Sequence, residues 1–223
     1  MAFAGFGRRA WLGAAAVAFS GTGLVGCDEM RRPPGQSPLP AELAPPGPDP
    51  VRGAITATAS AFAEQGRRLA GQPQAAARAV AQFEYLYDAI GREARWGALV
   101  PSVRISLRIA RDEIRQVIGI RPEATGPQIV QAMAQVVRSL RVRDRNGAAA
   151  ALSGAIFAPG GQATVFRLNR PGPMPTAEQA TAQLATEVAR LDAQGGWAGS
   201  VASPEAGFGS TLSPGLGGGG GSY

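Results

Sequence analysis

The acidic residues are the first candidates for chemistry, because the chain contains no histidine. Glu84 and Asp88 are four residues apart, so a helix would place both carboxylates on one face. Two carboxylates about 5–9 Å apart could serve as acid and base in glycoside hydrolysis. Arg92 and Arg95 follow closely and would supply partners for Asp88 and its surroundings. This spacing favours a solvated, charge-paired helix face over a reactive pair.

The lack of histidine excludes several other kinds of site. A serine or cysteine nucleophile activated by histidine needs an imidazole, and so does a histidine-ligated zinc site. Cys27 is the single cysteine of the 223 residues, which excludes an intramolecular disulfide. We therefore expect no catalytic residues, no metal and no cofactor.

Arginine supplies all 22 basic side chains, and four of them form a stripe along one side of an expected helix: Arg104, Arg108, Arg111 and Arg115. One interpretation is a contact surface for lipid headgroups, an acidic polymer or an acidic protein, since guanidinium groups suit bidentate recognition. The other is an ordinary polar face, partly neutralised by Asp112 and Glu113, and the sequence favours it. A second basic run, at 138–145, would complement the C-terminus of another helix.

Aromatic side chains gather in the segment that carries the paired acids: Phe83, Tyr85, Tyr87 and Trp96. On a helix, Tyr85 and Tyr87 are about 200° apart, so both cannot face the core. One of them is then either exposed for contact with a ligand or partner, or an amphipathic tyrosine beside the core. The second alternative is favoured.

Helical periodicity dominates the middle of the chain. Apolar residues recur at this spacing in five segments: about 51–70, 73–96, 101–119, 126–144 and 176–193. Asp49 and Thr125 are expected N-caps, and Thr176 with Gln179 has the pattern of a capping box. These helices can bury their apolar faces by packing side by side. We expect an all-α fold, an antiparallel bundle of five or six helices.

The stretch 148–170 fits two structures. Its first half has high helix propensity, and Pro159-Gly160-Gly161 is a strong breaker. A β-hairpin of 153–157 with 162–168 is one alternative. Helix-turn-helix is favoured, because an isolated hairpin is only marginally stable.

The two ends differ in composition from the middle. Residues 28–50 contain eight prolines, which predicts an extended tether. Residues 195–223 contain 11 glycines, which predicts a disordered tail. The expected division is therefore a signal at 1–26, a linker at 27–50, a helical domain at 51–194 and a tail at 195–223.

The first 27 residues have the order of a secretory signal: two arginines, an apolar run and small residues. Their last four residues, Leu24-Val25-Gly26-Cys27, resemble the lipobox of bacterial lipoproteins. The resemblance implies cleavage before Cys27, lipid modification of its sulfur and acylation of the new amino terminus. Several acyl chains anchor a protein stably where one does not.

These features predict a membrane-anchored envelope lipoprotein that faces the periplasm or the cell exterior. We expect its helical domain to bind a protein or an anionic envelope polymer without catalysis, and to bind no nucleic acid. Two alternatives are a carboxylate-dependent enzyme of the envelope, with two acids converging in a cleft, and a helical carrier enclosing an apolar ligand.

Overall fold

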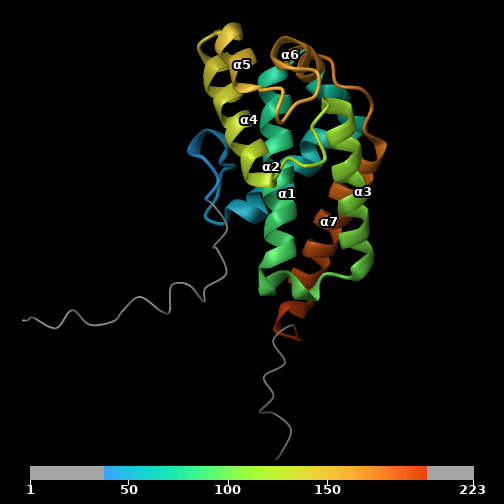
Figure 1. Cartoon of the computed structure of the whole chain (residues 1–223). Coiled ribbons are helices and arrows are strands. Elements are labelled where there is room, and N and C mark those ends of the chain that lie inside the picture. The colour runs from blue at the N-terminus through green and yellow to red at the C-terminus, as the bar shows by residue number, and fades with distance from the viewer. Residues whose placement is uncertain (1–37, 200–223) are drawn as a thin grey trace, which may run out of the picture. The chain divides into compact units, whose positions relative to one another are not determined.

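The computed structural model describes residues 38–199, which fold into seven α-helices (Figure 1). The helices are α1 Pro50–Phe62, α2 Pro73–Arg92, α3 Pro101–Ile118, α4 Gly126–Arg141, α5 Arg145–Ala151, α6 Gly161–Asn169 and α7 Pro175–Gln194. Across 38–199 no strand forms, and one isolated bridge joins Ile120 to Phe157. The expected all-α class is confirmed. The signal at 1–26, Cys27 and the tail from residue 200 lie outside the described residues.

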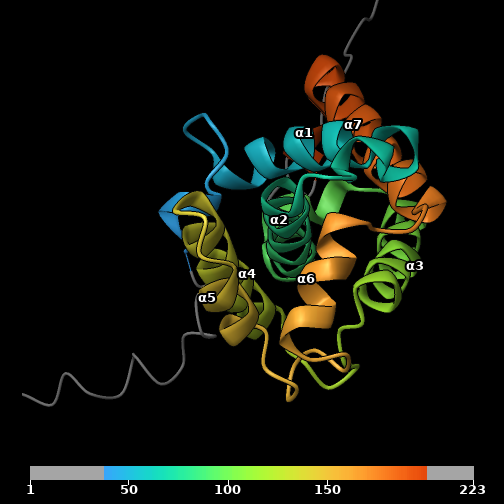
Figure 2. The ribbon, with the colours of Figure 1, turned by 90° about the horizontal axis from the view of Figure 1, so that it is seen from above.

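Helix α2 is the centre of the fold (Figure 2). In that view α2 is seen end-on, with α4 on one side, α3 on the other and α1 lying across it. Its side chains are buried all round between Ala79 and Leu86, where alanines allow neighbouring helices to approach closely. Phe83 packs edge-on against Phe62 of α1, with ring centroids 6.0 Å apart. The apolar spacing predicted that this helix would bury one face, whereas over this stretch the structure buries it on all sides.

The helix starts largely follow their sequence signals. The Asp49 carboxylate accepts hydrogen bonds from the amides of Val51 and Arg52, and Gln128 accepts one from the amide of Thr125. At α7 the expected capping box is absent, because the helix begins at Pro175 and places Thr176 inside its first turn. There the carboxylate of Glu113, on α3, accepts from the amides of Thr176 and Ala177 instead.

Helix α1 ends eight residues before the expected boundary at 70. Glu64, Gln65 and Gly66 adopt left-handed backbone conformations, and residues 63–69 form a 3-10 segment. The Glu178 carboxylate of α7 accepts hydrogen bonds from the amides of Glu64 and Gln65, at 2.8 and 3.2 Å. A contact 114 residues away in sequence therefore stabilises this turn. Helix α2 likewise ends at Arg92, and residues 94–98 form a 3-10 segment rather than a continuation to 96.

The packed part of the chain extends beyond the expected boundaries at 51 and 194. Leu43, within the expected linker, is fully buried, and its carbonyl accepts a 2.7 Å hydrogen bond from Gln82 of α2. Trp197, within the expected tail, packs edge-on against Trp96 with ring centroids 5.5 Å apart. Burial of Leu43 explains the first extension, because fully burying such a side chain stabilises the fold by about 1.5–3 kcal/mol. The ring contact of the partly buried Trp197 explains the second.

The ambiguous stretch is a helix-turn-helix, as favoured. Helix α5 ends at Ala151, and α6 begins at Gly161 after the breaker. The turn between them is anchored by Phe157, which is fully buried and pairs with Ile120 after α3. This turn therefore packs against the end of α3 instead of folding into a hairpin.

Candidate functional site

A buried charged cluster joins α2 to α3 at the place where the sequence pairs acids and arginines. The Glu84 side chain is fully buried. Its Oε1 accepts from Nε of Arg115 at 2.7 Å, and its Oε2 accepts from Arg111 at 2.6 and 2.9 Å and from Arg115 at 3.0 Å. Both carboxylate oxygens are thus occupied by charged donors. This arrangement holds two helices together and leaves Glu84 no oxygen directed at a substrate.

Arg111 is fixed from a second side by an aromatic ring. Its guanidinium lies 4.3 Å from the centroid of the Tyr87 ring, a cation–π distance. Tyr85 is buried whereas Tyr87 is half-buried, so the two tyrosines divide between core and surface as the helical geometry requires. Tyr87 has a structural role here as the amphipathic partner of Arg111.

Asp88 is the more accessible acid of the expected pair. Its carboxylate lies 4.0 Å from Arg111 and 4.0 Å from Arg92 and packs against the backbone of Gly126. Burial raises the pKa of Asp88 above its usual value, and the opposing attraction of Arg111 and Arg92 is weaker. The pair therefore offers one available carboxylate, whereas glycoside hydrolysis uses two.

Three of the four arginines in the stripe donate hydrogen bonds inside the protein. Arg104 donates to the carbonyl oxygens of Ile90 and Trp96, at 2.8 and 2.7 Å, and Arg111 and Arg115 bind Glu84. Arg108 is exposed. The stripe thus runs along the flank of α3 that faces α2, and Arg108 lies at its outer edge.

The outer face of α3 carries two large apolar side chains beside Arg108. Ile105 is 52% exposed and Ile109 is 49% exposed, and their spacing of four residues places them on adjacent turns. We call Ile105, Arg108 and Ile109 the α3 outer face. Sequence reasoning missed it, although a signal exists: both isoleucines are out of phase with the buried positions Val103 and Leu107.

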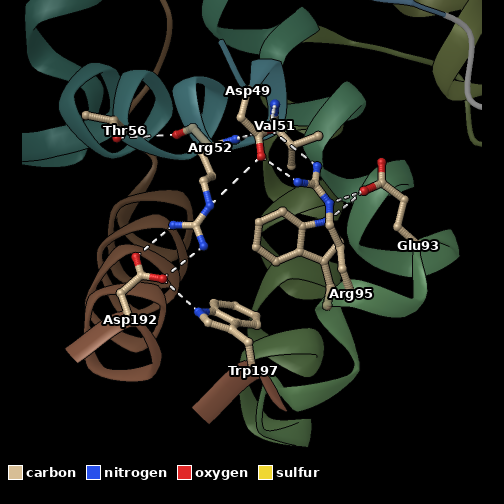
Figure 3. A network of polar contacts seen from close by, with 9 residues as sticks. Asp49, Val51, Arg52, Thr56, Glu93, Arg95, Asp192 and Trp197 are labelled. Atoms are coloured by element: carbon tan, nitrogen blue, oxygen red, sulfur yellow. Dashed lines mark hydrogen bonds and ion pairs between the residues drawn. The ribbon is translucent and has the colours of Figure 1, made fainter. Parts of the chain in front are cut away.

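A second polar network ties the two ends of the described chain together (Figure 3). Arg52 of α1 binds both oxygens of Asp192 on α7, at 2.7 and 2.9 Å, and Asp192 also accepts from the indole of Trp197. Arg95 binds Asp49 and Glu93 and lies 4.6 Å from the Trp96 ring centroid. Arg95 therefore forms its ion pairs with Asp49 and Glu93, and not with Asp88 as the sequence spacing suggested. The network fixes the start of α1 against the end of α7.

Comparison with known proteins finds no matching family model, no matching curated protein and no matching solved structure. Within 38–199, no group of three or more acidic, cysteine or histidine side chains is placed to hold a metal ion. In the same range, no helix has the length and apolar character needed to cross a bilayer.

Proposed function

We propose that this protein is a membrane-anchored envelope lipoprotein, attached through acyl chains on Cys27, whose helical domain binds another envelope protein without catalysis. The observation that carries the binding role is the α3 outer face. The anchor is supported by the lipobox-like sequence that ends at Cys27, which lies outside the described residues.

The α3 outer face has the composition of an interface centre. Apolar and arginine side chains are enriched in the cores of protein interfaces. Ile105 and Ile109 supply adjacent apolar surface, and the exposed Arg108 between them in sequence supplies a charge for an acidic residue of the partner. Asp112 is also exposed on this helix, so the surface is mixed in charge and favours a protein over a uniformly anionic polymer.

Site-specific photocrosslinking in the native cell envelope tests the binding role. A photoreactive residue replaces Ile109 in the full chain, and a second strain carries it at Val142, which is 71% exposed. We expect one discrete protein adduct from position 109 that is absent from position 142. Adding Ile105→Ser and Arg108→Gln should abolish this adduct. Because both side chains are exposed, each substitution should change the free energy of unfolding by no more than about 0.5 kcal/mol.

Two results would overturn the proposal. Equal adducts from positions 109 and 142, or adducts with lipid alone, would show that α3 has no specific protein partner. Mass spectrometry of the native N-terminus tests the anchor separately: cleavage before Cys27 with an acylated cysteine is expected, and an unmodified Cys27 in a soluble product would refute it.

A further inference from the structure

A basic pocket lies between the start of α2 and the turn that joins α4 to α5. It has a volume of about 770 Å³, and three arginines line it: Arg78, Arg143 and Arg145. Its wall also includes Gln74 and Ala75 in the first turn of α2. We call this the arginine pocket, and we propose that it binds a phosphate-bearing organic anion. This inference goes beyond the partner-binding role.

The charge in the pocket is uncompensated by the protein. Its lining contains no aspartate or glutamate. Arg78 is positioned through its Nε, which donates to the carbonyl of Glu42 at 3.3 Å, while the Glu42 carboxylate pairs with Arg138. Within 38–199, Arg143 and Arg145 form no ion pair. Three arginines therefore line one pocket whose wall carries no acidic side chain.

Arg143 occupies a backbone position that usually belongs to glycine. Its φ is 62°, in the left-handed region. Its amide donates to Leu140 O and the amide of Asp144 donates to Ser139 O, at 3.0 and 2.9 Å, which is the Schellman pattern that ends many helices. Glycine adopts this conformation without strain, whereas arginine does not. The backbone conformation alone thus favours glycine at 143, and a role in binding an anion in the pocket would explain why arginine stands there.

The chemistry of the lining fits phosphate. Arginine forks bind phosphate oxygens in a bidentate manner, and three of them match a group with several charged oxygens. The amides of Gln74 and Ala75, which follow Pro73, have no acceptor within their own helix, and the Gln72 side chain does not cap them. The volume lies in the range of pockets for small organic ligands, about 300–1,000 Å³, so it suits a phosphate ester more than the bare ion.

A phosphate ester could come from a lipid headgroup or from a soluble metabolite, and the test separates these sources. The full chain is titrated calorimetrically with glycerol 3-phosphate, with glycerol as the uncharged match. In a second arm it is reconstituted into bilayers of phosphatidylcholine, with or without phosphatidylglycerol, and the amide signals of Gln74 and Ala75 are followed by NMR. Binding in the first arm assigns a soluble ligand, and a response to phosphatidylglycerol alone assigns a headgroup.

Arg143→Gly separates binding from folding. Glycine relieves the left-handed strain, so this variant should melt at or above the temperature of the parent, yet it should bind glycerol 3-phosphate or phosphatidylglycerol at least about tenfold more weakly, since a charged hydrogen bond is lost. Arg145→Gln should also weaken binding. Arg92→Gln removes an exposed arginine from the last turn of α2, at the opposite end of that helix from the pocket, and should leave binding unchanged.

Two outcomes would overturn the proposal: no binding in either arm, or an equal loss in Arg143→Gly and Arg92→Gln, which would indicate nonspecific attraction to a basic protein. Both are independent of the adduct expected at position 109. The pocket can therefore fail while the partner-binding role stands, and the reverse also holds.

Discussion

The Nε of Arg115 donates a hydrogen bond of 2.7 Å to Oε1 of Glu84, whose side chain has no contact with solvent. Arg111 binds the other oxygen, so one carboxylate of α2 is held by two guanidinium groups of α3. Removing a charged partner at a buried site leaves the remaining charges unpaired, and that loss is larger than the net contribution of the intact pair. Glu84 is therefore a residue on which the α2–α3 contact depends.

Glu84→Gln should destabilise the domain by about 3 kcal/mol, because an amide cannot neutralise the buried Arg115 and the half-buried Arg111, and its NH₂ group would face their donors. The free energy of unfolding, measured by urea denaturation and circular dichroism, checks this. Asp112→Asn is the matched control, since Asp112 is exposed on α3 and its change should stay within about 0.5 kcal/mol. If both variants lose the same stability, Glu84 does not join the helices.

The second prediction concerns Asp49, which both caps α1 and pairs with Arg95. Burial opposes its charge, but hydrogen bonds from Arg95 and from the amides of Arg52 and Val51 prevail and hold the pKa of Asp49 below its usual 3.8. Its charged form therefore stabilises the fold at pH values above 3.8, and this contribution disappears as the pH falls through the lower pKa of the folded state.

Asp49→Asn keeps a capping oxygen but removes the ion pair, whereas Asp49→Ala removes both. At neutral pH, Asp49→Ala should cost about 1 kcal/mol more than Asp49→Asn, the usual value of an N-cap. The stability difference between the parent and Asp49→Asn should shrink as the pH falls below 3.8. Thermal melts between neutral and acidic pH measure both effects, and a difference that grows on acidification would contradict the assignment.

Much of the helical architecture could be predicted from periodicity. The buried faces of α3 and α4 follow apolar spacing, and Gly119 and Thr125 sit at the ends that their residue types favour. The central place of α2 could not be predicted in this way. Its covering by α1, α3 and α4 depends on how separate helices pack, which no single segment encodes.

The candidate site shows the same division between local and distant effects. The spacing of Arg111 and Arg115 places them on one side of α3, but their pairing with Glu84 brings together residues 27 and 31 positions apart. The turn at 64–66 is held by Glu178, another distant carboxylate. Charge patterns within one helix therefore predicted which residues share a side, and tertiary contacts decided which of them face solvent.

The third prediction concerns the start of the packed domain. Leu43→Ala should destabilise the protein by about 2–3 kcal/mol, because it leaves a cavity under a proline-rich segment that was expected to be a free tether. Leu39 is only partly buried against the same core, so Leu39→Ala should cost less. Urea denaturation of the two variants tests this ranking. If Leu43→Ala leaves stability unchanged, residues 38–49 are not part of the folded unit.

The last prediction compares the effect on stability of replacing two glycines, Gly91 and Gly119, by alanine. Gly91 lies within α2 and a methyl group there would meet nothing within 4 Å, whereas Gly119 ends α3 with φ +85° and a methyl group would meet Cγ of Pro159 at 2.7 Å. Gly91→Ala should stabilise the protein by about 0.5–1 kcal/mol through helix propensity. Gly119→Ala should destabilise it by about 1–2 kcal/mol from the left-handed backbone, and further through the contact with Pro159. The melting temperatures of the two variants should therefore shift in opposite directions, and an unchanged or raised melting temperature for Gly119→Ala would show that glycine is not required at the end of α3.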